Sequence, residues 1–118
     1  MFDRLNIIEK RYDQINESLQ NASVINDLKK YTSLMKERSS IEKTVEVYRK
    51  YKELVEEIKG LKELSKDKDK DIAQMAELEL EESIKEQKKL ENDLKVLLIP
   101  KDENDEKNVI VEIRGAAG

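Results

Sequence analysis

The feature that most constrains this chain is a long helical repeat of apolar side chains through its middle. Between residues 28 and 61 they recur mostly at intervals of three or four, which places them along one side of an α-helix. The members of the repeat are Leu28, Tyr31, Leu34, Met35, Ile41, Val45, Tyr48, Tyr51, Val55, Ile58 and Leu61. No proline interrupts the repeat, and its one glycine, Gly60, lies near its end. A helix of about 35 residues would be roughly 50 Å long, which is typical of a coiled-coil arm.

Two further amphipathic helices are predicted, one on each side of the long one. The first has apolar residues at Leu5, Ile8, Tyr12, Ile15 and Leu19. It ends within residues 20–23, where the side chain of Asn21 or Ser23 suits a turn, and the long helix then begins near Asn26 or Asp27, either of which can cap it. The last helix has apolar residues at Ile72, Met75, Ala76, Leu80, Ile84, Leu90, Leu94, Leu97 and Leu98. Pro100 limits it, because proline disfavours helical backbone at the preceding residue.

Residues 65–71 alternate lysine and aspartate after Ser65 and contain no apolar residue, which predicts an exposed turn between two antiparallel helices. Residues 26–64 carry a net charge of +2 and residues 65–98 a net charge of −3, so the two arms are expected to attract each other weakly. Within single helices, favourable i,i+4 pairs are predicted for Glu46–Lys50, Glu81–Lys85 and Glu91–Lys95. The predicted fold is therefore all-α: a long antiparallel, coiled-coil-like helical hairpin with an additional N-terminal helix, three helices in all.

The composition narrows the chemistry available to this fold. Only 37% of the 118 residues are apolar and 42% are charged, so the core must be thin. The chain contains no cysteine and no histidine, which removes disulfides, thiolate chemistry and the commonest metal ligand and general base. Adjacent acids such as Glu56 and Glu57 point about 100° apart on a helix, which does not suit a catalytic dyad. The predicted protein is soluble and cytoplasmic, has no membrane partner, and needs no cofactor.

Three groups of residues allow a second interpretation. Asp67, Asp69 and Asp71 alternate like calcium ligands, and Asp102, Asn104 and Asp105 form a similar cluster. Both clusters lack the full calcium-loop pattern, so plain turns are favoured. The four tyrosines, Tyr12, Tyr31, Tyr48 and Tyr51, could stack on bases, but Tyr12, Tyr31 and Tyr48 lie on the apolar stripes and are predicted to pack in the core with their hydroxyls at its rim. The basic groups Lys29–Lys30 and Arg49–Lys50 with Lys52 could contact phosphates, but a solvated helical face is favoured.

The end of the chain does not continue the helical pattern. Residues 100–107 form a polar, acidic connector, and residues 108–114 alternate in the manner of a β-strand, with Val109, Val111 and Ile113 on one face. A single strand cannot pair its own backbone groups, so its partners are expected outside this chain. The predicted organisation is a helical domain over 1–99, a linker over 100–107, and the truncated start of a second, α/β domain over 108–118.

The residues at the end of the chain resemble a segment of a known protein family. The run from Leu97 to Asp102, the acidic turn, the strand 108–114 and the small-residue segment 115–118 resemble the junction between the first and second domains in the bacterial peptide chain release factor 1 family. Related factors that read UGA differ at this junction, so the resemblance implies termination at UAA and UAG codons. It also implies binding to the ribosome near the GTPase-associated region of the large subunit, with contacts to ribosomal RNA and protein, and interaction with the recycling GTPase release factor.

In that family the codon-reading tripeptide lies in the second domain and the Gly-Gly-Gln loop for peptidyl-tRNA hydrolysis lies in the third. Neither is present in these 118 residues. No catalytic, cofactor-binding or metal-binding residue is therefore assigned, and the chain is expected to be a docking and positioning module rather than an enzyme. The alternative is a free-standing structural coiled-coil adaptor, and the apolar stripes also allow a homodimer of the isolated chain.

Overall fold

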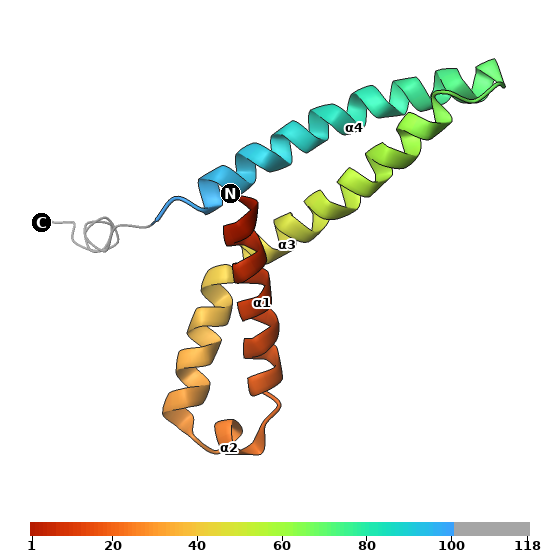
Figure 1. Ribbon diagram of the computed structural model, residues 1–118. Helices are drawn as coiled ribbons and strands as arrows, with labels where there is room; N and C mark the ends of the chain where they lie inside the picture. Colours follow the sequence, from red (N-terminus) through yellow and green to blue (C-terminus); the bar gives the residue numbers. More distant parts are fainter. Residues whose placement is uncertain (101–118) are drawn as a thin grey trace, which may run out of the picture.

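The computed structural model describes residues 1–100 and shows an elongated, entirely helical arrangement. Its extents are 62 × 43 × 20 Å and its radius of gyration is 20.8 Å. A compact domain of about 100 residues would have a radius of gyration of about 13 Å. The thin core expected from the composition therefore takes the form of extended arms rather than a globule (Figure 1). No helix within these 100 residues combines the length and the apolar content that crossing a membrane requires.

The described residues contain four helices: α1 (Phe2–Ser18), α2 (Ala22–Ile25), α3 (Leu28–Leu64) and α4 (Lys70–Leu97). The long helix α3 is shared by two antiparallel hairpins (Figure 1). Its first part packs against α1 and its second part against α4, so the two hairpins project in different directions. The all-α class and the long hairpin are confirmed for this part of the chain.

The predicted helix boundaries are confirmed where local capping chemistry fixes them. Asp27 is the N-cap of α3, and its side chain accepts a hydrogen bond from the backbone N–H of Lys30 at 3.2 Å. Asp69 caps α4 through the N–H of Asp71 at 3.0 Å. Asn21 supports the first turn by accepting from the N–H of Ser23 at 3.0 Å. The predicted count of three helices is wrong, because the segment after Asn21 forms the additional helix α2, whose single turn is too short to show a periodicity.

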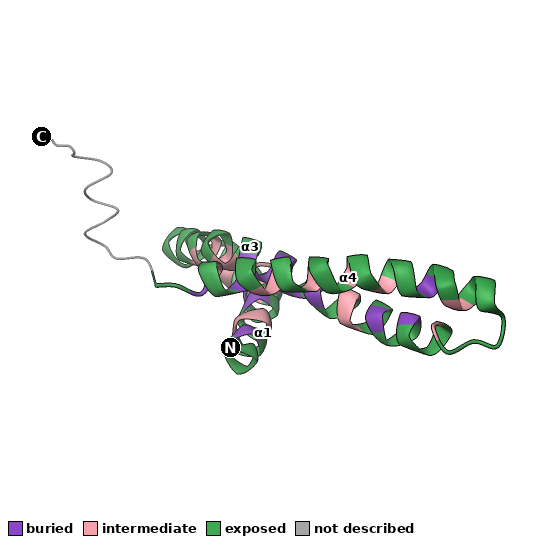
Figure 2. Ribbon diagram, turned by 90° about the horizontal axis from the view of Figure 1, so that it is seen from above, coloured by how far each residue is buried: buried purple, intermediate pink, exposed green. Residues whose placement is uncertain are grey.

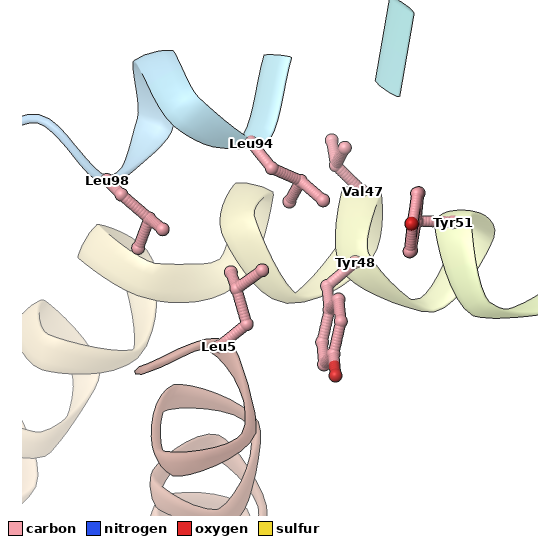
Figure 3. Packing of buried hydrophobic residues seen from close by; sticks show 6 residues of the cluster. All are labelled: Leu5, Val47, Tyr48, Tyr51, Leu94 and Leu98. Carbon is pink, nitrogen blue, oxygen red and sulfur yellow. The ribbon is translucent and has the colours of Figure 1, made fainter. Parts of the chain in front are cut away.

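The main hydrophobic cluster lies where α1, α3 and α4 meet (Figure 3). Its buried members are Leu5, Val47, Tyr48, Tyr51, Leu94 and Leu98. The ring of Phe2 stacks on the Tyr51 ring, with the centroids 5.4 Å apart. Because α1 supplies Leu5, α3 the Val47 to Tyr51 turn, and the end of α4 Leu94 and Leu98, this one cluster joins the two hairpins.

Buried residues are concentrated at this junction, and further ones lie along both hairpins (Figure 2). Examples are Ile15 on α1, Ile58 and Leu61 on α3, and Ala76 on α4. Five residues predicted to lie on buried stripes are exposed: Leu28 and Tyr31 at the start of α3, and Ile72, Met75 and Ile84 on α4. The physical reason is that each half of α3 has only one long partner helix. A stripe wide enough for two neighbours is therefore left partly uncovered away from the junction.

The last helix ends at Leu97, three residues before Pro100, as predicted. Residues 101–107 of the predicted linker, the Asp102 to Asp105 cluster, the strand at 108–114 and the small-residue segment 115–118 lie outside the described residues. The domain boundaries at 99 and 107 therefore remain predictions.

Candidate functional site

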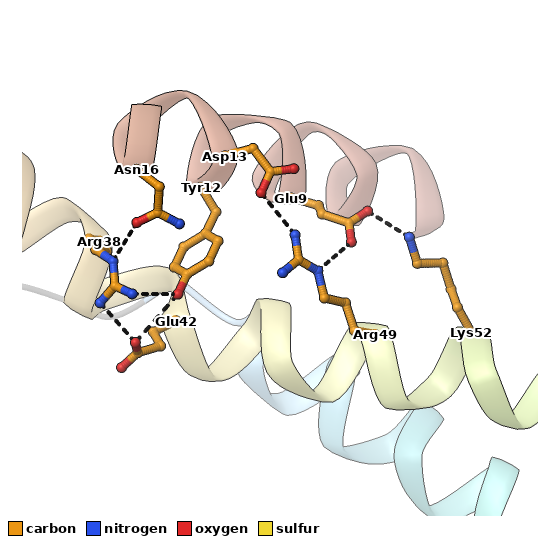
Figure 4. Close-up of polar contacts among 8 residues, drawn as sticks. All are labelled: Glu9, Tyr12, Asp13, Asn16, Arg38, Glu42, Arg49 and Lys52. Carbon is orange, nitrogen blue, oxygen red and sulfur yellow. Dashed lines mark hydrogen bonds and ion pairs between the residues drawn. The ribbon is translucent and has the colours of Figure 1, made fainter. Parts of the chain in front are cut away.

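Polar side chains on the facing surfaces of α1 and α3 form two neighbouring hydrogen-bonded groups, which we together call the α1–α3 clamp (Figure 4). It consists of Glu9, Tyr12, Asp13, Asn16, Arg38, Glu42, Arg49 and Lys52. The α1 members are spaced by three, four or seven positions, so they fall on one side of the helix, next to the buried Leu5, Tyr12 and Ile15. The clamp thus borders the apolar contact between the same two helices.

The centre of the clamp is the carboxylate of Glu9. Its Oε2 accepts a hydrogen bond from Nε of Arg49 at 2.8 Å, and its Oε1 accepts one from Nζ of Lys52 at 2.6 Å. The same guanidinium donates through Nη2 to Oδ1 of Asp13 at 2.9 Å. Two basic side chains of α3 therefore hold two acidic side chains one turn apart on α1.

The second part of the clamp is organised around the Arg38 guanidinium. It donates to Oδ1 of Asn16 at 2.6 Å, to the Tyr12 hydroxyl at 2.9 Å and to Oε2 of Glu42 at 2.9 Å. Its carbon lies 5.1 Å from the centroid of the Tyr12 ring, within the range of a cation–π contact. Close by in sequence, Arg11 binds Glu37 through two hydrogen bonds of 2.6 and 2.7 Å, so this end of α1 is also tied to α3.

These contacts shift the pKa values of several of the charged groups, among them Glu9, Glu37 and Arg49. Partial burial works against ionisation of Glu9, but the hydrogen bonds from Lys52 and Arg49 outweigh it and hold the pKa of Glu9 below its ordinary value. The hydrogen bond from Arg11 likewise lowers the pKa of Glu37. The hydrogen bond to Glu9, with that to Asp13, raises the pKa of Arg49. Both shifts favour the charged forms of Glu9 and Arg49, so this ion pair is present at neutral pH.

The structure shows the contacts of the basic residues and tyrosines for which the sequence allowed two interpretations. Arg49 and Lys52, considered as phosphate contacts, pair with α1 instead. Tyr12 and Tyr48 are buried with their hydroxyls at the rim, as predicted, and the Tyr48 hydroxyl donates to Oδ1 of Asn6 at 2.6 Å. For Tyr31 the same prediction is wrong because its side chain is exposed.

The weak attraction predicted between the last two helices does not appear as an ion pair between them in the described residues. None of the ion pairs there joins α3 to α4, and the intrahelical pairs predicted for Glu46, Glu81 and Glu91 do not come within 4.0 Å. The strong interhelical ion pairs lie between α1 and α3. The net charges of the last two arms do not predict this pairing, although the spacing of Glu9, Asp13 and Asn16 places them on one side of a helix and indicates it.

The end of α4 is held by the first turn of the chain. Nη2 of Arg4 donates to the backbone carbonyl of Leu98 at 3.2 Å, across 94 positions in sequence. Leu98 itself is buried in the junction cluster. The point at which the chain leaves α4 is therefore fixed relative to α1 by one hydrogen bond and one apolar contact.

The described residues offer little to a small-molecule or metal ligand. The surface hollows are open depressions between neighbouring side chains of one or two helices, such as the one lined by Arg11, Gln14, Glu17, Ser18 and Asn21. No group of three or more acidic side chains there is placed to hold a metal ion. In the turn before α4, Asp67 accepts from the N–H of Asp69 and Asp69 from that of Asp71, so these carboxylates cap backbone groups.

Comparison with known proteins decides the family. A family model described as the PCRF domain matches residues 8–118, which is most of the chain and includes all of α3 and α4. The chain belongs to the PCRF domain family. The resemblance inferred from the segment after Leu97 is confirmed at this level.

Curated relatives of this PCRF domain are named peptide chain release factor 1. The protein of Enterococcus faecalis is 49% identical over 119 aligned positions, covering all of this chain and 33% of the relative. That of Listeria monocytogenes is 51% identical with the same coverage, and that of Bacillus cytotoxicus is 48% identical, with 34% of the relative covered. The chain thus spans about a third of the length of these relatives. No solved structure matches this chain at a significant level.

Proposed function

We propose that this chain is the N-terminal helical domain of a peptide chain release factor that directs translation termination at UAA and UAG codons. The observation that carries the proposal is identity of about half over the entire chain to proteins named peptide chain release factor 1. The alignment with these proteins covers residues 101–118, where the sequence pattern itself predicts a domain junction. In this proposal residues 100–107 link the helical domain to a second domain that begins near residue 108.

The geometry supports a positioning role for the domain. Three long helices joined at a single apolar junction form a frame 62 Å long, and the α1–α3 clamp holds α1 against α3. The surface hollows in the described part are open, whereas a catalytic site needs convergent groups in a concave space. Within the proposed factor, the helical domain docks on the ribosome and hydrolysis of peptidyl-tRNA depends on residues outside this chain.

The proposed partners follow from the proposed function. The ribosome is the main one, through the RNA and protein of the GTPase-associated region of the large subunit, and the recycling GTPase release factor is the second. The place of action is the cytoplasm, where ribosomes terminate translation. No cofactor or metal enters this function.

The alternative function is a free-standing coiled-coil adaptor. It is favoured by one observation, the exposed apolar side chains Leu28, Tyr31, Ile72 and Met75 on the stripes. Such an adaptor would use these side chains to form a stable homodimer. Sedimentation equilibrium of the 118-residue chain tests the adaptor, because a chain that stays monomeric lacks the stable homodimer on which that function depends.

A release assay tests the proposed function directly. The full-length gene product that contains this chain is added to ribosomes carrying a labelled peptidyl-tRNA and a UAA, UAG or UGA codon in the decoding site. Peptide release at UAA and UAG, with little at UGA, is the expected result. Absence of release at every codon would rule out the proposal, and efficient release at UGA would rule out the codon assignment.

A further inference from the structure

We propose that the corner formed by α2 and the start of α3 binds an acidic protein surface through an apolar contact surrounded by lysines. The α2–α3 corner consists of Ile25, Leu28, Lys29, Lys30, Tyr31 and Lys36. It lies at the end of the α1–α3 hairpin farthest from α4 (Figure 1). The inference rests on the proposed function, since it specifies the partner that this part of the domain would contact.

The corner exposes apolar side chains where the helical repeat predicts burial. Leu28 is 77% exposed and Ile25 is 53% exposed. Leu28 begins the same stripe that is buried farther along α3 at Val45, Tyr48 and Ile58. Neither α1 nor α4 covers this start of the stripe. Clustered apolar side chains with a polar border are typical of a protein interaction site.

The charge around these apolar side chains is positive. Lys29, Lys30 and Lys36 form no ion pair within residues 1–100. The nearest acids in the sequence do not pair with these lysines: Asp27 caps α3 by accepting from the backbone N–H of Lys30, and Glu37 binds Arg11. Three lysine charges are therefore available to a partner. A complementary partner has an apolar side chain flanked by aspartate or glutamate, as on an acidic amphipathic helix.

The shape of the corner suits such a side chain. A shallow hollow lies between Leu28, Lys29, Thr32, Ser33 and Lys36, and a second one adjoins it between Lys29, Lys30, Ser33 and Leu34. Both are lined by a leucine with lysine stems beside it, and these stems add apolar surface while their ammonium groups stay in water. One aliphatic anchor with a charged rim matches the usual arrangement of a protein interface.

A protein partner fits this surface better than RNA. Phosphates are bound most effectively by arginine, and the arginines nearest the corner, Arg11 and Arg38, already bind side chains of the clamp and its neighbour Glu37. The exposed aliphatic side chains Ile25 and Leu28 would gain nothing from contact with a phosphate backbone. Tyr31 is the single aromatic ring available for stacking on a base.

Site-specific cross-linking of the full-length gene product tests the proposal. The photoreactive residue benzoylphenylalanine replaces Leu28, and the protein is bound to purified ribosomes with a UAA codon in the decoding site. The matched control carries the same residue at Ile7, which is similarly exposed but lies on α1. The expected product from position 28 resists ribonuclease, is removed by protease, and maps by mass spectrometry to a protein segment rich in aspartate or glutamate. A cross-link to RNA, to a second copy of this chain, or to nothing would overturn the proposal, as would equal cross-linking from position 7.

A charge reversal completes the test. Lys29→Glu with Lys30→Glu is expected to lower the cross-linking yield at subsaturating protein by about tenfold, because two attractive contacts become repulsive. Lys66→Glu with Lys68→Glu in the turn before α4 is the matched control and should leave the yield unchanged. An undiminished yield from the first pair would overturn the electrostatic part of the proposal. Peptide release measured on the same wild-type protein reports separately on the proposed function, so either proposal can fail alone.

Discussion

The carboxylate of Glu9 on α1 lies 2.6 Å from the ammonium nitrogen of Lys52 on α3, a contact between residues 43 positions apart in sequence. The same carboxylate accepts from Arg49, and the Glu9 side chain is 17% exposed. Most surface ion pairs contribute little to stability because water screens them and their side chains are free to move. Glu9 differs from these because it is partly shielded and bound by two cations at once.

Glu9→Gln is therefore expected to lower the free energy of unfolding by about 1 to 2 kcal/mol, since it removes a charge that two basic side chains share. Urea unfolding of the 118-residue chain, followed by its helical circular dichroism, provides the measurement. Glu56→Gln is the control, because Glu56 is exposed and its only ion pair within residues 1–100 is the 3.4 Å contact with Lys59. Equal effects from the two substitutions would show that the clamp adds nothing to the α1–α3 contact.

Leu94→Ala is expected to destabilise the protein by about 2 to 5 kcal/mol, because it leaves a cavity where three helices meet. The Leu94 side chain has 0% exposure and belongs to the junction cluster. Leu78→Ala changes the same atoms on the same helix, but Leu78 is 62% exposed, so its effect should stay within about 0.5 kcal/mol. Thermal unfolding of both variants measures the difference. A loss from Leu78→Ala as large as that from Leu94→Ala would contradict the placement of the core.

Gly60→Ala is expected to stabilise the chain by about 0.5 to 1 kcal/mol. Gly60 lies inside α3, and a Cβ atom added there would meet nothing within 4 Å. Alanine loses less backbone entropy than glycine when a helix forms, and here it causes no clash. The midpoint of urea unfolding should rise while the slope stays unchanged. A lower midpoint would mean that position 60 contacts something beyond the described residues.

Stability should fall in acid through the two carboxylates whose pKa values the fold lowers, Glu9 and Glu37. The unfolded chain binds protons near pH 4.3, about the ordinary value for glutamate, and the folded chain binds them at lower pH. The contribution of these groups is thus fully present above that pH and disappears as the pH falls through the folded pKa values. Unfolding free energy measured from pH 6 to pH 3 should drop less steeply in Glu9→Gln with Glu37→Gln than in the wild type. Parallel curves would contradict this assignment.

The sequence was sufficient for those parts of the fold that depend on neighbouring residues. Asp27 caps α3 as predicted, because the geometry depends on a carboxylate and the backbone N–H three positions later. Asp69 caps α4 by the same local chemistry, within the turn predicted at residues 65–71. The turn before α4 and the end of α4 near Pro100 follow from the same kind of local rule. The release-factor resemblance also depended on a contiguous segment after Leu97, and the PCRF family match confirms it.

Features that depend on which helices pack against each other could not be predicted from neighbouring residues. A single apolar stripe on α3 does not say which half contacts α1, so Leu28 was expected to be buried and Glu9, Arg38 and Arg49 were not assigned to a clamp. The one-turn helix α2 left no periodic signal. Each of these outcomes is set by long-range packing, as in the hydrogen bond from Arg4 to the Leu98 carbonyl.

The central claim is that this helical domain positions a release factor and does not take part in the chemistry. The most direct measurement is the rate of peptide release at a UAA codon against protein concentration, for the full-length gene product and for a version that begins at Pro100. The claim predicts a higher concentration for half-maximal release by the shortened protein and a similar rate at saturation, because only binding is weakened. A saturating rate that falls greatly while the half-maximal concentration stays the same would contradict it.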